Sequence, residues 1–157
     1  MIPDSNLKET LSKHLFGGQA FIPVDEMLKK ISFTDIHLRP KGLPYSFYEL
    51  FYHMWFTQND IIEYCTNSLY SAPSWPQDYW PEKVAPAKEI EWKELQKSYF
   101  EDRQRLADLI EEVELHDHVP SNEEHSIFRE IMLVIEHTSY HSGQLLIILR
   151  HLRLHSS

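Results

Sequence analysis

The stretch that decides the fold is residues 126–152, SIFREIMLVIEHTSYHSGQLLIILRHL. Its side chains form a stripe that advances by three or four residues at a time, which is the spacing of one face of an α-helix. The stripe consists of Ile127, Ile131, Val134, Thr138, His141, Leu145, Ile148 and Leu152. The pattern predicts a long amphipathic helix whose apolar face is interrupted by Thr138 and His141, with His137 on its flank.

Helical patterns also occur earlier in the chain. The expected helices span residues 5–16, 24–32, 46–67, 88–114 and 126–152. Gly17 and Gly18 stop the first of them. Ser46 and Glu49 have the spacing of a capping box, in which each side chain accepts a hydrogen bond from the backbone of the other residue. The helix over 88–114 carries an apolar stripe made of Trp92, Leu95, Tyr99, Leu106, Leu109 and Val113.

Two polar or proline-rich segments connect the later helices. Residues 71–87 hold four prolines interleaved with Trp75, Tyr79 and Trp80, which predicts an ordered, aromatic-rich crossover. Residues 115–124 are polar and include a proline, so we expect a turn there. Long helices joined by one long crossover are typical of a helix bundle. We therefore predict an all-α, four-helix bundle that forms a single domain over residues 1–157.

Composition narrows the function classes. The single cysteine, Cys65, excludes an intramolecular disulfide and fits a reducing compartment. The formal net charge of −9 repels a phosphate backbone, so no nucleic-acid partner is expected. The longest apolar runs, residues 131–135 and 145–149, are too short to cross a bilayer, so no membrane partner is expected either. The opening residues 1–6 lack the basic start and apolar core of a signal peptide, which predicts a cytoplasmic protein.

The chemistry is concentrated in His137 and His141. Their spacing places two imidazoles one turn apart on the same helix face, where they can share one ion. His53 is the candidate third ligand, because it lies in the middle of another long helix. Three imidazoles suit zinc, nickel, copper or iron, and they leave a coordination position open for water or substrate. Each of these residues is equally consistent with a hydrogen-bonded core histidine, and the residues alone leave that alternative open.

A second histidine pair, His151 and His155, has the same spacing. It lies at the C-terminal end, where fraying adds an ordering cost, so we do not expect it to hold a metal. Cys65 is also an unsuitable ligand, because it lies roughly 18 Å further along the helix axis than His53.

Two stretches of the chain resemble a known family. Residues 48–65, YELFYHMWFTQNDIIEYC, are similar to the second helix of DinB/YfiT-like proteins. Residues 136–145, EHTSYHSGQL, resemble the closing helix of that family, in which His-x-x-x-His is followed by a Gly-Gln step. The resemblance implies a four-helix bundle, often a homodimer, with a metal site at His53, His137 and His141 that holds one divalent ion, zinc or nickel.

The resemblance also implies candidate activities. Some DinB/YfiT-like proteins are thiol-dependent transferases or isomerases that act on a small-molecule substrate with a low-molecular-weight thiol. A metal-dependent hydrolase is the alternative enzyme, and Glu49 or Glu130 would be its base by helical phase. A non-catalytic metal-binding or dimer-forming stress protein is the third possibility. The catalytic residues and the cofactor-binding residues remain unassigned.

Further residues have a structural and a functional interpretation. Trp75, Tyr79 and Trp80 either roof the metal site or pack the crossover onto the bundle. Asp102 and Arg103 are expected to form a structural ion pair or to be surface charges. For Glu49 a helix cap is the expected role, and for Glu130 a place on a solvated face.

Overall fold

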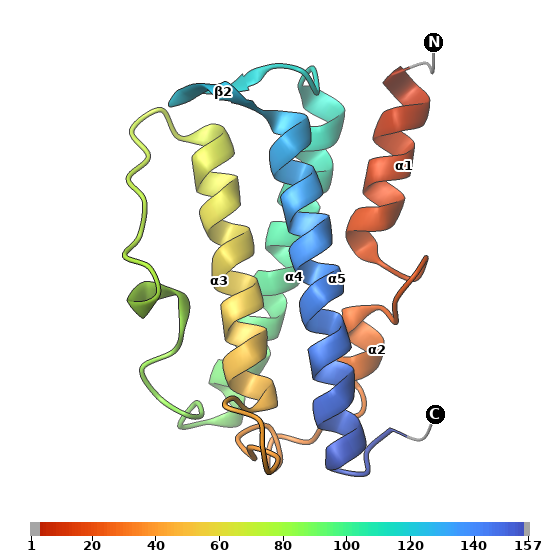
Figure 1. Ribbon diagram of the computed structural model, residues 1–157, viewed down its shortest axis with the longest axis vertical. Coiled ribbons are helices and arrows are strands. Elements are labelled where there is room, and N and C mark those ends of the chain that lie inside the picture. The colour runs from red at the N-terminus through yellow and green to blue at the C-terminus, as the bar shows by residue number, and fades with distance from the viewer. Residues whose placement is uncertain (1–3, 156–157) are drawn as a thin grey trace.

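The four long helices of this computed structural model, which describes residues 4–155, lie side by side as a bundle (Figure 1). They are α1 (Asp4–Phe16), α3 (Phe47–Thr66), α4 (Glu89–Glu112) and α5 (Ile127–His151). The shorter elements are α2 (Val24–Leu28), the 3-10 helix η1 (Gln77–Tyr79), and the strands β1 (His118–Val119) and β2 (Asn122–Ser126). The predicted all-α, four-helix bundle is confirmed. Residues 1–3, part of the stretch examined for a signal peptide, lie outside the described residues.

Local chemistry explains where the helices begin and end. At the start of α3, the Ser46 hydroxyl accepts a hydrogen bond from the Glu49 amide at 3.2 Å, and the Glu49 carboxylate accepts one from the Ser46 amide at 2.8 Å. This is the capping box predicted from the sequence. At the start of α5, the Ser126 hydroxyl accepts from the Arg129 amide. Helix α1 ends where Gly17 adopts a positive φ of 82°, a conformation that costs glycine little.

Two segments differ from expectation. The second helix ends at Leu28, not at residue 32, because the chain turns at Lys29 and Lys30. The predicted polar turn over 115–124 contains an antiparallel β-hairpin, in which β1 pairs with β2 through a turn at Pro120. The hairpin is anchored by Val119, which is buried as part of one of the two apolar core clusters, and β1 packs against α3.

The interior has two apolar halves. One half contains Phe47, Phe51, Trp92 and Leu145, and it surrounds the start of α3 and the end of α5. The other half surrounds the opposite ends of these helices. Its buried members include Ile62, Leu106, Ile110, Ile131 and Val134. Along α4 and α5, buried polar residues occupy the interval between the halves. The bundle therefore has a central layer of buried polar side chains, with an apolar cluster on either side of it along the helix axes.

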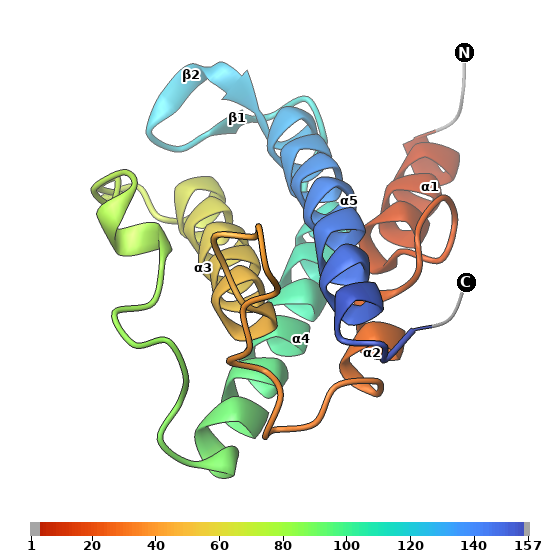
Figure 2. The ribbon, with the colours of Figure 1, turned by 60° about the horizontal axis from the view of Figure 1, so that its bottom comes forward.

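The crossover between α3 and α4 lies beside α3, on the side away from α5, in both views (Figures 1 and 2). Helices α1 and α2 lie on the opposite side of α5. Helix α5 therefore packs against α3 on one side and against α1 and α2 on the other.

Within residues 4–155, every helix is too short or too polar to span a bilayer.

Candidate metal centre

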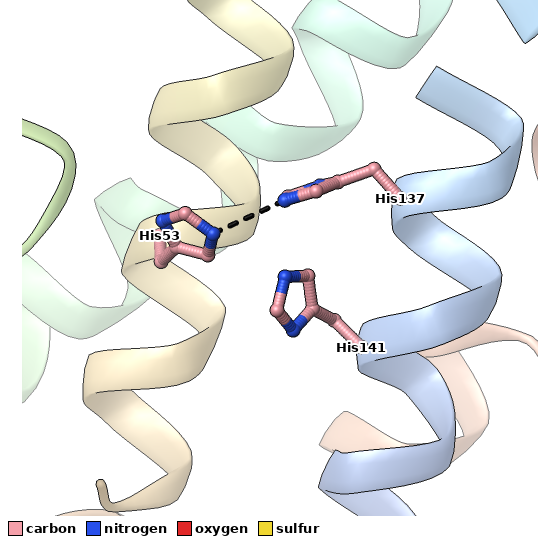
Figure 3. Close-up of side chains that lie close together, drawn as sticks. All are labelled: His53, His137 and His141. Carbon is pink, nitrogen blue, oxygen red and sulfur yellow. Dashed lines mark hydrogen bonds between the residues drawn. The ribbon is translucent and has the colours of Figure 1, made fainter. Parts of the chain in front are cut away.

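The central polar layer brings together the three histidines predicted to be ligands. His53 comes from α3, and His137 and His141 come from consecutive turns of α5 (Figure 3). One ring nitrogen from each lies within 4.8 Å of the others. His53 and His141 are buried, and His137 is half-buried. The three rings converge on one point between the two helices.

The spacing of the nitrogens fits a shared ion. The Nε2 atoms of His53 and His137 are 3.1 Å apart. Two imidazole nitrogens bound to one ion at ordinary zinc–nitrogen bond lengths are separated by roughly 3.3 Å in tetrahedral geometry and about 2.9 Å at right angles. The observed separation lies between these values, so His53 and His137 are already at ligand distance from each other.

Hydrogen bonds orient two of the rings. His53 Nδ1 is 3.1 Å from the backbone carbonyl oxygen of Tyr79, and His141 Nδ1 is 2.6 Å from the side-chain oxygen of Gln144. Both acceptors lack a proton, so each Nδ1 carries the hydrogen and donates it. The Nε2 lone pair of each ring is then free for a metal. Such outer partners are the usual means by which proteins hold ligating histidines.

The layer keeps the rings neutral. Burial, together with the neighbouring histidines, lowers the pKa of His137 to about 3 and that of His141 to about 4. Burial also lowers the pKa of His53. Neutral imidazole is the form that binds metal, so the site is ready for an ion at neutral pH without first losing protons.

Aromatic residues of the crossover enclose one side of the site. The Trp80 ring stacks on His53 at a centroid distance of 4.4 Å. Tyr79 contacts Phe56, and its hydroxyl donates a hydrogen bond to Asp60 at 2.5 Å. Both interpretations of these aromatics therefore hold: they pack the crossover onto α3, and Trp80 also lines the candidate site.

Glu49 and Glu130 are not near the three histidines. The Glu49 carboxylate is held by Arg39 and by the capping box. Glu130 is buried and pairs with Arg129, so its predicted place on a solvated face is wrong. The metal-competent group among the described residues contains histidines alone. Neither carboxylate is placed to serve as a base at this site.

The expectation for Asp102 and Arg103 is also wrong. Both side chains are buried, and they do not pair with each other. Asp102 accepts hydrogen bonds from Arg105 at 3.0 Å and from Asn59 at 3.3 Å. Arg103 donates to three uncharged oxygens. Adjacent helix positions point about 100° apart, which explains why these neighbours find different partners.

The remaining candidates stay outside the cluster. His151 and His155 are not part of the metal-competent group found within residues 4–155. Burial raises the pKa of the Cys65 thiol to about 12, which keeps it protonated and unsuited to bind metal. Sequence reasoning missed the orienting acceptors on Tyr79 and Gln144. Only Gln144 had a visible signal, because it follows His141 by three residues on the same helix.

The sequence profile of the DinB family matches residues 23–153, which include all three histidines. No curated protein sequence and no solved structure matches the chain.

Proposed function

The chain belongs to the DinB family, and from that premise we propose that it binds one divalent ion, zinc or nickel, through His53, His137 and His141 and acts as a thiol-dependent transferase or isomerase. The observation that carries the proposal is the convergence of three neutral imidazole nitrogens within 4.8 Å of one another. Three protein ligands leave coordination positions open, which is the pattern of a catalytic site.

Charge favours an anionic ligand, such as a thiolate, at the open position. Three neutral imidazoles leave the double positive charge of an ion uncompensated, and the Arg103 cation is close enough to lower the pKa of His137. An anionic ligand is therefore favoured there. A bound divalent ion would act as a Lewis acid that lowers the pKa of a thiol and stabilises its thiolate form.

Hydrolysis is the less favoured chemistry. It requires a base beside the attacking water, and Glu49 and Glu130 are engaged by arginines elsewhere. Transfer of a thiol needs no such base once the thiolate has formed. The chain contributes oriented imidazoles, and it flanks them with the exposed rings of Trp75 and Tyr140, which offer apolar surface to an electrophilic small molecule.

The test uses cobalt-loaded protein purified without a metal-affinity column. Glutathione should produce a sulfur-to-cobalt charge-transfer band, whereas S-methylglutathione, which lacks the thiol, should not. Metal-dependent conjugation of glutathione to monobromobimane should accompany the band. A band without turnover across a panel of thiols and electrophiles would favour the non-catalytic metal-binding alternative, and failure to take up any metal would overturn the proposal.

The homodimer implied by the family resemblance stays a prediction. Light scattering coupled to size-exclusion chromatography tests it, because it measures the mass of the particle independently of its shape.

A further inference from the structure

Arg103 is a buried cation that has no anionic partner within the part of the chain that the structure describes. Its side chain is among the largest that are fully buried in the bundle. It donates to the Leu15 carbonyl at 2.8 Å, to the Tyr99 hydroxyl at 2.5 Å and to the Thr138 hydroxyl at 3.0 Å. Among the side chains that the structure describes, no carboxylate lies within 4.0 Å of its nitrogens.

The three acceptors compensate the charge only in part. The tyrosine and threonine hydroxyls carry no formal charge. The Leu15 carbonyl belongs to the last turn of α1, where the helix dipole contributes about half a negative charge. Buried charges are normally paired, because desolvation of an unpaired ion is costly. Much of the positive charge of Arg103 is therefore left without a counter-ion.

A cavity of about 530 Å³ adjoins this cation. Its lining comes from the end of α1, the start of α2, α4 and α5. Helices α1 and α2 lie on the side of α5 away from α3 (Figures 1 and 2). None of the three histidines of the candidate metal centre lines this cavity. The apolar part of the lining consists of Leu15, Phe16, Pro23, Val24 and Phe100.

We propose that this cavity is a binding site for a small monocarboxylate with an apolar body, whose carboxylate pairs with Arg103 and whose body contacts the apolar walls. Leu15, Tyr99 and Thr138 engage three of the five N–H donors of the Arg103 guanidinium group, so two donors remain for a charge-assisted hydrogen bond to a carboxylate. Asp25 also lines the cavity, in a pair with Lys29 at 3.0 Å. A single cation with a carboxylate nearby favours a monoanion over a dianion such as phosphate.

The test compares octanoate with 1-octanol, which has the same chain length and no charge. Calorimetry on metal-free protein should show octanoate binding at least about tenfold more tightly than octanol, as expected for a charge-assisted pair. Equal affinities would mean that the cavity recognises only apolar surface and would overturn the proposal, as would failure of octanoate to bind.

Variants locate the site. Arg103→Met should weaken octanoate binding at least about tenfold, whereas Lys97→Met, which also replaces a cation by methionine but at an exposed position of α4, should not. Asp25→Asn removes the neighbouring carboxylate and should strengthen octanoate binding. His53→Ala should leave it unchanged, which separates this site from the metal centre. If Arg103→Met does not fold, the other two results decide: either an unchanged octanoate affinity in Asp25→Asn or equal affinities for octanoate and octanol overturns the assignment.

Discussion

The Nε2 atoms of His53 and His137 lie 3.1 Å apart, although 84 positions separate the two residues along the chain. Two imidazole nitrogens that face each other in this way can share one proton, or both can direct their lone pairs at one cation. The second arrangement satisfies both rings and admits His141 as a third ligand. The antiparallel contact of α3 with α5 thus brings together a candidate metal site that neither helix holds alone.

The first prediction concerns the ligands. Alanine in place of His53, His137 or His141 should weaken zinc binding by more than the roughly 10–100-fold that loss of an outer hydrogen-bond partner costs, because two imidazoles hold an ion poorly. The wild type should bind about one zinc ion per chain. Isothermal titration of the three variants measures the effect.

The matched control is the double variant His151→Ala with His155→Ala. It removes a pair of identical spacing at the end of α5, so zinc affinity and stoichiometry should stay as in the wild type. Loss of zinc binding in this double variant, with retention in His53→Ala, would show that the assigned site is wrong.

The second prediction tests the orienting acceptor on Gln144. Gln144→Met removes the partner of His141 Nδ1 without changing a ligand, so zinc affinity should fall about 10–100-fold. Gln144→Glu keeps an acceptor and should retain affinity close to that of the wild type. Gln104→Met, an exposed glutamine on α4, is the control. Wild-type affinity in Gln144→Met would mean that the hydrogen bond does not orient the ligand.

The third prediction is a pH dependence of stability in the metal-free protein. Burial lowers the pKa of His137 to about 3 and that of His141 to about 4, from an unfolded value of 6.5. The unfolded chain therefore binds protons first as the pH falls. The stability that these rings contribute is fully present above pH 6.5 and is lost progressively below it.

Urea unfolding at several values between about pH 7.5 and pH 5 measures this loss. Each histidine that is neutral in the folded state adds up to about 1.4 kcal/mol per pH unit to the slope of the free energy of unfolding. His137→Gln should reduce the slope, whereas His151→Gln, at an exposed position, should not. An identical slope in wild type and His137→Gln would contradict the burial argument.

The fourth prediction concerns metal removal. The two apolar halves of the core do not include the ligands, so the bundle should keep its far-UV helical signal after chelation. The melting temperature should still fall, because an ion present at a thousandfold excess over its Kd contributes about 4 kcal/mol. Loss of most of the helical signal on chelation would instead identify the ion as a structural one.

Local sequence determined much of the fold. The spacing of apolar residues predicted α5 within a residue at each end, and the Ser46–Glu49 pair predicted the start of α3. These features depend on residues within a few positions of one another, where helix geometry dictates which side chains meet. For the same reason the one-turn spacing of His137 and His141 already placed both imidazoles beside each other.

Tertiary structure alone decided the burial of charge and the orientation of the rings. Glu130 and Arg103 are charged residues, so sequence reasoning placed them at the surface or in a simple pair, and both are buried with other partners. The carbonyl of Tyr79 reaches His53 only because the crossover folds back onto α3. Helix periodicity determines which side chains share a face, but what covers that face depends on segments far away in the chain. The histidines were therefore predictable as candidate ligands. The convergence of their three rings and the uncompensated charge of Arg103 arise instead from packing between helices.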